Sequence, residues 1–161
     1  MNEPIIRPIE KSDNLFVKSV VQSVFIELDA PKIGTAYEDP SLDCMFETYK
    51  KNRTAYFVVE EAGKIIGCAG IAPLDDYDGN ICELQKMYFL PEARGRGLGA
   101  AMMELCLTTA VAYNYDQCYL ETFGFMKAAQ KLYQRVGFRY LEKSLGNTGH
   151  YSCPVHMLKD L

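Results

Sequence analysis

Hydrophobic residues recur along the chain with two periods, and their order predicts an alternation of strands and helices. Short segments rich in β-branched and aromatic residues favour strands. A tight turn over 61–64 joins two of these segments as a hairpin, and the polar residues 75–80 turn the chain into the next one. The predicted strands cover 5–9, 55–60, 65–74, 82–90, 117–122, 138–141 and roughly 151–158.

Between these segments, apolar residues recur at helical spacing and predict helices. Ser12 is expected to cap the first helix and Ser41 the second, because serine side chains bond the free N–H groups of a helix start. A third helix begins behind a glycine-rich turn, and the last is expected to end at Gly137. The apolar stripes are Val17, Val21, Val24, Leu28; Leu42, Met45, Phe46, Tyr49; Leu98, Met102, Leu105, Thr109, Ala112; and Phe125, Ala129, Leu132, Val136.

The resulting order is strand, two helices, three strands in hairpin succession, helix, strand, helix and two strands. Such an order predicts a mixed α/β (α+β) sheet with helices packed on it. At 161 residues, with no repeat and no linker, we expect one domain over residues 1–161.

Composition narrows the possible partners and the compartment. The formal net charge of −4 argues against nucleic acid or an anionic membrane as partner. No long apolar run predicts a membrane span, and the first residues carry no signal-peptide pattern. None of the 6 cysteines forms a C-x-x-C pair, so no metal site is expected, and a reducing, cytoplasmic setting is the simplest account.

The stretch from Arg94 to Ala100 holds three glycines and two arginines in front of the third predicted helix. Glycines allow tight turns and close approach of a ligand to the backbone. Free N–H groups at a helix start, together with the helix dipole, form a site for phosphate or pyrophosphate. Arg94 and Arg96 are expected to add positive charge at its rim.

Two nucleotide-binding motifs compete for this stretch. A P-loop needs Lys-Ser/Thr after its last glycine, and Ala100 stands there instead. The dinucleotide fingerprint does match at Gly95, Gly97 and Ala100, with Glu121 near the expected acidic position. However, residues 91–94 separate the glycines from their strand, and the preceding strands look antiparallel rather than parallel.

A third interpretation rests on two motifs. Residues 87–100 resemble the coenzyme A segment of the GCN5-related N-acetyltransferase (GNAT) family, whose pattern Arg/Gln-x-x-Gly-x-Gly/Ala is filled by Arg94, Gly97 and Gly99. Downstream, residues 129–138 resemble the family's A-x-x-L-Y-x-x-x-G-F, with Leu132-Tyr133 and Gly137-Phe138 in place. Both motifs occur in the family's order, so the chain is identified as a GNAT member.

The resemblance implies a fold and a cofactor, acetyl-CoA. The family fold is a mostly antiparallel mixed sheet of about six to seven strands with about four helices, splayed between the fourth and fifth strands. The splayed strand binds the pantetheine arm through its backbone, and the glycine-rich turn binds the pyrophosphate. Carried onto this chain, the cofactor-binding residues are Met87, Tyr88, Phe89, Arg94, Gly95, Arg96, Gly97, Leu98, Gly99, Ala100, Met126 and Ala129, with Met126 where relatives often have asparagine.

The same resemblance implies an N-acetyltransferase that moves acetyl from acetyl-CoA directly to a primary amine. A base must remove the amine proton. Glu83 is the first candidate, because several family members carry a catalytic glutamate at this place, eleven residues before Arg94. Strand alternation also places it on the same face as Met87 and Phe89. Glu121 is the reserve base, the Phe89 N–H is the expected oxyanion donor, and Tyr133 is the expected general acid.

The acceptor is expected to enter opposite the cofactor, over the early loop and the second helix, where Tyr37 and Asp39 lie in an acidic rim suited to a cationic amine. Glu121 is also assigned to the acceptor. Its identity stays open between small molecules and peptides. Family members are often homodimers, which makes a homodimer possible here. A module that senses acyl-CoA without turnover is the alternative function, and a dinucleotide-binding protein is a more distant one.

Overall fold

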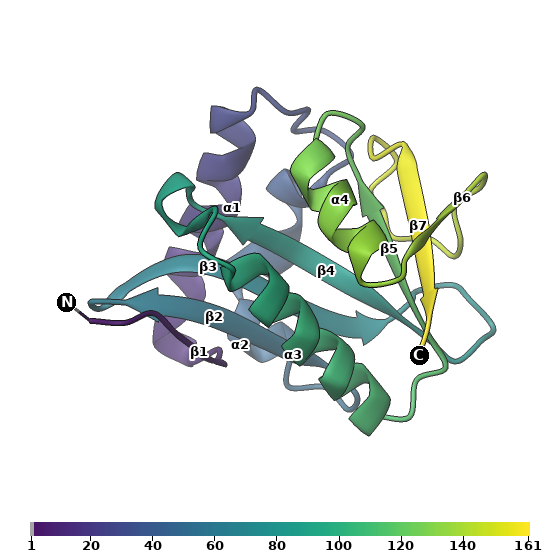
Figure 1. The fold of residues 1–161 in the computed structure, drawn as a ribbon, viewed down its shortest axis with the longest axis horizontal. Coiled ribbons are helices and arrows are strands. Elements are labelled where there is room, and N and C mark those ends of the chain that lie inside the picture. Colours follow the sequence, from purple (N-terminus) through teal and green to yellow (C-terminus); the bar gives the residue numbers. More distant parts are fainter. Residues whose placement is uncertain (1) are drawn as a thin grey trace.

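A computed structural model describes residues 2–161, which form a seven-stranded sheet in the order β1-β2-β3-β4-β5-β7-β6 (Figure 1). Neighbouring strands are antiparallel except for the parallel pair β4–β5. The mixed, mostly antiparallel sheet expected from the sequence is confirmed. The strands are β1 Ile5–Pro8, β2 Ala55–Glu61, β3 Lys64–Pro73, β4 Ile81–Phe89, β5 Gln117–Thr122, β6 Arg139–Leu141 and β7 Val155–Asp160.

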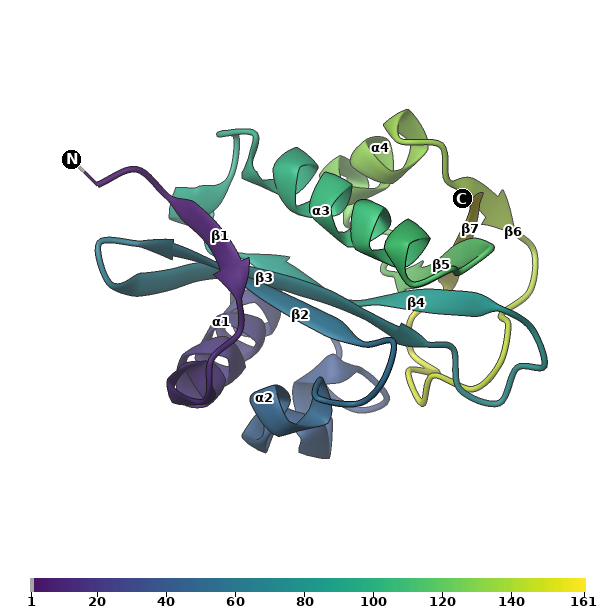
Figure 2. The same cartoon turned by 90° about the horizontal axis from the view of Figure 1, so that it is seen from below.

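Helices cover both faces of the sheet (Figure 2). α1 (Asn14–Glu27) and the short α2 (Met45–Thr48) lie on one face, and α3 (Leu98–Ala112) and α4 (Lys127–Arg135) lie on the other. Short 3-10 turns connect them at Lys11–Asp13, Ala36–Glu38, Pro40–Asp43 and Pro91–Ala93. Each face has its own apolar core, since the sheet separates the side chains that point to α1 from those that point to α3.

The expected helix caps are wrong. A 3-10 turn occupies Lys11–Asp13, and there the backbone N–H of Glu10 donates to Asp13, so Ser12 does not cap α1. In the same way Ser41 lies inside a 3-10 turn, and α2 begins only at Met45. The capping preference of Ser12 was overridden by a tertiary contact. The guanidinium of Arg7 on β1 lies 2.8 Å from the carboxylate of Asp13, and the local sequence pattern does not show this contact.

Two apolar stripes are also shifted from the predicted positions. The buried face of α3 consists of Met102, Met103, Cys106 and Ala110, while Ala112 is exposed. On α4 the buried residues are Gln130 and Tyr133, whereas Leu132 is only half-buried and Phe125, just before the helix, is 50% exposed. Apolar residues on α4 therefore do more than fill the core, because several of them face a cavity described below.

The parallel pair β4–β5 is short, and this opens the sheet. Pairing runs only from Ile81 with Gln117 to Glu83 with Tyr119. Beyond Glu83 the two strands separate, while β4 stays bonded to β3 as far as Phe89. The expected splay between the fourth and fifth strands is confirmed, and it leaves one edge of β4 without a strand partner.

A β-bulge in β4 reverses the expected orientation of Glu83. Lys86 has a φ of +47°, and the register against β3 shifts between Cys68 and Gly70. An extra residue in one strand moves all later side chains to the opposite face. As a result Met87 and Phe89 pack with the α3 side, and Glu83 does not share their face as strand alternation predicted; it shares the face of Tyr88 instead.

Opposite the bulge, Gly70 allows close packing of β2 and β3. A Cβ there would meet the backbone oxygen of Ala55 and the ring of Tyr56 at distances that real Cβ atoms do not reach. We expect Gly70→Ala to lower the free energy of unfolding by about 2 kcal/mol. Urea unfolding measures this. Gly124→Ala is the control, because a Cβ at Gly124 meets no heavy atom within 4 Å; equal losses in the two variants would contradict the assignment.

Candidate active site

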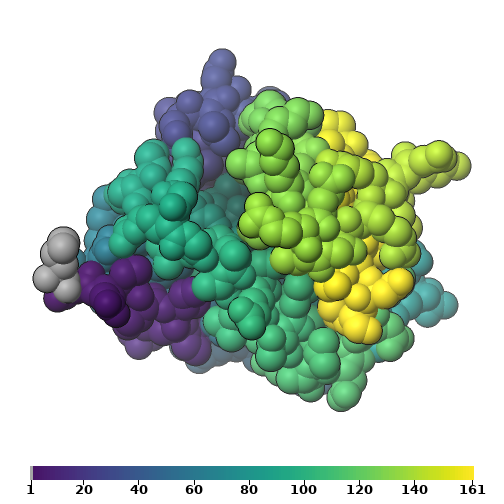
Figure 3. Space-filling view, in the orientation of Figure 1, coloured from purple at the N-terminus to yellow at the C-terminus, as the bar shows by residue number. Residues whose placement is uncertain are grey.

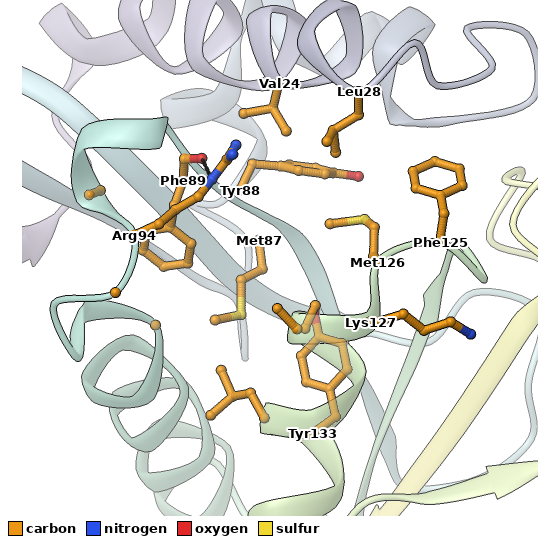
Figure 4. A pocket seen from close by; sticks show the side chains of 16 residues that line it. Val24, Leu28, Met87, Tyr88, Phe89, Arg94, Phe125, Met126, Lys127 and Tyr133 are labelled. Atoms are coloured by element: carbon orange, nitrogen blue, oxygen red, sulfur yellow. Dashed lines mark hydrogen bonds between the residues drawn. The ribbon is translucent and has the colours of Figure 1, made fainter.

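A cavity of about 380 Å³ lies where β4 leaves its neighbour, between the end of α1, the turn after β4 and the start of α4 (Figure 4). In Figure 3 a hollow is visible on this face between the teal segment that follows β4 and the green α4. The lining is mostly apolar. Its residues are Val24, Leu28, Met87, Tyr88, Phe89, Ala93, Arg94, Gly95, Gly99, Phe125, Met126, Lys127, Ala128, Ala129, Leu132 and Tyr133.

The free edge of β4 presents backbone groups to this cavity. The N–H of Leu90 donates to Ile66 on β3, so alternation turns the N–H and C=O of Phe89 toward the gap. The guanidinium of Arg94 already uses that carbonyl, with Nε donating to it at 3.0 Å (Figure 4). The Phe89 N–H therefore points where an extended ligand could add itself to the strand.

The glycine-rich turn supplies a second set of free donors. Gly95 and Gly97 have φ of +69° and +77°, the left-handed region that glycine tolerates best. Ala101 makes the first backbone bond of α3, to Gly97, and within residues 2–161 the amides of 95–100 donate to no other group. A Cβ at Gly95 or Gly97 would point into open space, so this cradle has room for a pyrophosphate. The amide of Arg94 is not part of it, since it donates to Pro91.

The two arginines expected to add positive charge at the rim are both neutralised by ion pairs. Arg94 makes a bidentate ion pair with Glu27 at the end of α1, at 2.7 and 2.8 Å. Arg96 pairs in the same way with Glu61 at 2.6 and 3.1 Å. The carboxylates come from distant parts of the chain, and they fix both side chains in place. Backbone amides are therefore the principal unpaired donors of the turn.

Most residues assigned to the cofactor lie at the cavity. Met87, Tyr88, Phe89, Arg94, Gly95, Gly99, Met126 and Ala129 line it, whereas Arg96, Gly97, Leu98 and Ala100 do not. The sequence reasoning missed Val24 of α1 and Leu28 just after it, together with Phe125 and Lys127. Nothing in the local sequence marks the α1 residues, because they appear as an ordinary apolar stripe and reach the cavity only through the packing of α1 on the sheet.

A second, much smaller cavity of about 30 Å³ adjoins the first on the β5 side. The two share four lining residues, Met87, Tyr88, Met126 and Tyr133. The smaller one adds polar groups, among them Lys86 and Glu121, and the thiol-bearing Cys153. A ligand in the large cavity and a group entering from the β5 side would thus meet beside Tyr133.

Tyr133 lies at this junction and is 6% exposed. Its ring packs edge-on against Phe138, at 5.9 Å between centroids. Within residues 2–161 the Tyr133 hydroxyl has no hydrogen-bond partner. Every fully buried side-chain oxygen in these residues does have one, so the hydroxyl cannot be fully buried and must reach the cavity. Burial, followed by the nearby Cys118, raises the pKa of Tyr133 above its ordinary value, which keeps the hydroxyl protonated as a proton donor.

Glu83 lies on the other face of β4, lines neither cavity and is 5% exposed. Burial raises the pKa of Glu83 to about 7, although a hydrogen bond from the Gln85 amide at 2.6 Å opposes the rise. Its Oε1 accepts that bond, and Oε2 has no protein partner within residues 2–161. Since no fully buried side-chain oxygen there lacks a partner, Oε2 is accessible to water. A carboxylate with a pKa near neutrality suits proton abstraction.

Glu121 differs because its oxygens are occupied. The Tyr119 hydroxyl donates to Oε2 at 2.6 Å, and the Thr148 hydroxyl donates to Oε1. His156 lies 3.4 Å from Oε2. Glu121 thereby fastens the segment before β7 to the sheet while still lining the small cavity.

The expected acidic rim is neutralised. Asp39 lies 3.0 Å from Lys86, whose side chain is 6% exposed, and 2.8 Å from Nε2 of His150. Although burial works against its ionisation, His150 and Lys86 together hold the pKa of Asp39 below its usual value. Tyr37 packs on Phe25 at 5.9 Å, and neither Tyr37 nor Asp39 lines a cavity. A lysine inside a largely apolar strand was the signal that could have identified Lys86.

Comparison with known proteins assigns this architecture to a family. The family model described as "Acetyltransferase (GNAT) family" matches residues 23–138. The uncharacterised N-acetyltransferase YjgM of Escherichia coli strain K12 is 41% identical over 160 residues, 98% of this chain and 95% of that protein. The chain belongs to the GNAT family, and it is an acetyl-CoA-dependent N-acetyltransferase.

Solved structures share the fold. A GNAT acetyltransferase of Staphylococcus aureus Mu50 has a TM-score of 0.84 at 20% identity, with 99% of each chain covered. A phosphinothricin acetyltransferase of Sinorhizobium meliloti, solved in complex with AcCoA, has a TM-score of 0.78 at 21% identity, covering 98% of this chain and 88% of that one. At such identities the likeness concerns the fold, which agrees with the splayed sheet described above.

Gly97 and Gly63 form a matched pair for testing the cradle. Their φ values are +77° and +78°, and a Cβ at either meets no heavy atom within 4 Å. Alanine at either position should cost about 1 kcal/mol of stability through left-handed strain. Only Gly97→Ala should weaken acetyl-CoA binding, by about tenfold, because it disturbs the amides of the cradle. Titration calorimetry measures both affinities, and unaltered binding by Gly97→Ala would refute this role of the turn.

The raised pKa of Glu83 predicts a pH-dependent stability. The folded chain keeps this proton up to about pH 7, and the unfolded chain loses it near 4.5, so ionisation disfavours the fold. This group should lower the free energy of unfolding by about 3 kcal/mol as the pH rises between these values. Glu83→Gln should remove that decrease, whereas the exposed Glu104→Gln should keep it. Urea unfolding across this pH range checks the difference, and parallel curves for wild type and Glu83→Gln would contradict it.

Proposed function

We propose that the chain acetylates a primary amine by direct attack in a ternary complex, with Glu83 as general base and Tyr133 as general acid. The observation that carries this proposal is the junction of two cavities at Tyr133, where β4 and β5 separate. Bound acetyl-CoA supplies an activated thioester there. Its pyrophosphate fits the amides of 95–100, and its pantetheine arm fits the free edge of β4.

In the proposed reaction a carbon–nitrogen bond replaces a carbon–sulfur bond, one proton leaves the amine, and one is added to the thiolate. The acceptor amine gives a proton to the Glu83 carboxylate, directly or through water, and its nitrogen forms a bond to the acetyl carbon. The Phe89 N–H donates to the carbonyl oxygen as negative charge develops there. The carbon–sulfur bond breaks, and the Tyr133 hydroxyl protonates the leaving thiolate. Glu83 then releases its proton to solvent, and Tyr133 recovers one from solvent, so that both residues return to their starting states.

Glu83 is preferred to Glu121 as the base because of their hydrogen bonds. Glu121 accepts from Tyr119 and Thr148 and acts mainly as an anchor, whereas Glu83 has an open oxygen and a pKa near 7. Cys153 at the small cavity is a poor nucleophile, since burial raises its pKa to about 12. This supports direct attack by the amine rather than an acetyl-cysteine route.

The acceptor is a small-molecule or peptide amine that approaches from the side of β5 and the segment before β7. Glu121 would lie nearest to it. Asp39 acts through Lys86 and His150. Tyr37 packs on Phe25 and contributes only to the structure of the early loop. The class of acceptor is identified by measuring thiol release from acetyl-CoA with a panel of amines that bear carboxylate, hydroxyl or peptide groups.

Residues 1–161 are proposed to act as one domain in a reducing, cytoplasmic setting, without nucleic acid or membrane as partner. The cysteines at 44, 68, 82, 106, 118 and 153 are all free thiols, which supports the reducing setting. Among residues 2–161, no helix combines the length and the apolar character needed to cross a bilayer. A homodimer is also proposed, and light scattering of the purified protein decides it.

The proposed roles predict how Tyr133→Phe behaves in that assay. Loss of the proton donor should lower kcat about 100-fold and leave acetyl-CoA affinity within about twofold, because only the hydroxyl is removed. Tyr115→Phe is the matched control, since its hydroxyl bonds the carbonyl of Arg53 away from both cavities. Wild-type kcat for Tyr133→Phe would disprove its role as the acid.

The same assay separates the alternatives. If acetyl-CoA binds tightly but no amine releases thiol, the chain senses acyl-CoA without turnover. If NAD rather than acetyl-CoA raises the melting temperature, the cavity binds a dinucleotide and the proposal fails.

A further inference from the structure

Glu83 is the end of a short hydrogen-bonded chain that starts outside the sheet. Tyr49, the residue that ends α2, donates its hydroxyl proton to Oε1 of Gln85. The Nε2 of Gln85 in turn donates to Oε1 of Glu83 at 2.6 Å. Tyr49 is 8% exposed, so this chain of bonds is largely shielded from water.

We propose that Gln85, oriented by the Tyr49 hydroxyl, is a positioning residue that fixes the Glu83 carboxylate in its proton-accepting form. This inference rests on the proposed function, because it assigns a task to Gln85 only if Glu83 is the base. It adds two residues, Tyr49 and Gln85, that line neither cavity.

The orientation of the Gln85 amide follows from the donors available. An amide has one acceptor end and one donor end. The Tyr49 hydroxyl stays protonated because burial, and then the charge of Glu83, raises its pKa well above the ordinary value. A protonated hydroxyl that donates to Oε1 leaves Nε2 for Glu83. The reversed amide would bring two oxygens together unless Glu83 were protonated, so the Tyr49 bond favours the ionised carboxylate.

Tyr49 is held in place by a second tyrosine. Its ring packs on that of Tyr56, with 4.7 Å between centroids. The Tyr56 hydroxyl donates to the carbonyl of Lys86 at 2.8 Å, at the bulge of β4. The two tyrosines thus contact consecutive residues of β4, Gln85 and Lys86. Because the bulge sets the face on which Glu83 lies, the same aromatic pair supports both the orientation and the hydrogen bonding of the base.

Other charged and titratable groups also face Glu83 and must stay constant in a test. His150 and Lys86 lower the pKa of Glu83, and Glu121 raises it. Tyr119, Cys153 and Tyr49 each respond to its charge as well. Replacing Gln85 or Tyr49 alone leaves the other groups in place, so any change of the Glu83 titration reports on the hydrogen-bonded chain.

The experiment titrates Glu83 in the full chain by carbon NMR of labelled glutamate carboxyl groups, with the Glu83 signal assigned by its loss in Glu83→Gln. Wild type should titrate near pH 7. Gln85→Leu removes the donor and should raise the midpoint by about one pH unit. Tyr49→Phe frees the amide to reverse and should raise it by about half a unit. Tyr115→Phe, which removes another buried tyrosine hydroxyl, should leave it unchanged.

Activity gives the second measurement. With an amine found in the panel, Gln85→Leu should move the lower limb of the kcat/KM profile up by the same one unit or so, and the KM for acetyl-CoA should not change. At pH 7 this corresponds to a loss of about fivefold. A merely structural role would lower activity without moving the limb.

Midpoints that stay at the wild-type value in both Gln85→Leu and Tyr49→Phe would overturn the proposal. If Gln85→Leu does not fold, Tyr49→Phe alone decides in the same way. A different result tests the proposed function: if the midpoints move but Glu83→Gln retains wild-type thiol release, the hydrogen-bonded chain is real and Glu83 is not the base.

Discussion

The early separation of β4 from β5 explains where the cavity lies and which groups surround it. Two parallel strands that stop pairing after Glu83 leave backbone donors and acceptors on β4 unused. Such groups are costly to bury without a partner. The fold resolves this by placing a cavity there instead of a core, so that a ligand can complete the edge. Phe89, Arg94 and the amides after it are all arranged around this one unpaired edge.

Most of the positive side chains close to the opening between β4 and β5 are paired with carboxylates. Acidic groups from α1, β2 and the early loop pair with Arg94, Arg96 and Lys86, three cations close to the gap. In the proposed mechanism, the phosphate is therefore bound by the fixed array of backbone amides, and the amine proton is taken by Glu83. Fixed donors and one perturbed carboxyl group need little reorganisation during reaction, which is how an enzyme site lowers a barrier.

Because of the bulge at Lys86, the side chains before it and after it that matter to the site lie on opposite faces of the sheet. Before it, Glu83 and Gln85 point toward α2 and Tyr49; after it, Met87 and Phe89 point toward α3. A regular strand would have put the proposed base and the apolar contacts of the cofactor cavity on one face. The irregular strand thus places the proposed base and the cavity-lining side chains on opposite faces of one short segment.

The sequence by itself determined the strands, the glycine turn and the family, because these depend on local periodicity and on motifs such as Arg94, Gly97 and Gly99 or Leu132-Tyr133. It also predicted about half of the cavity lining, Tyr133 included, whereas the catalytic roles of Tyr133 and Glu83 stay predictions. The tertiary structure alone decided the caps near Ser12 and Ser41, the face of Glu83, the pairing of Asp39 with Lys86 and His150, and the role of Tyr49. Each of these depends on a residue far away in the chain or on one inserted residue in a strand, and neither leaves a periodic signal in the sequence.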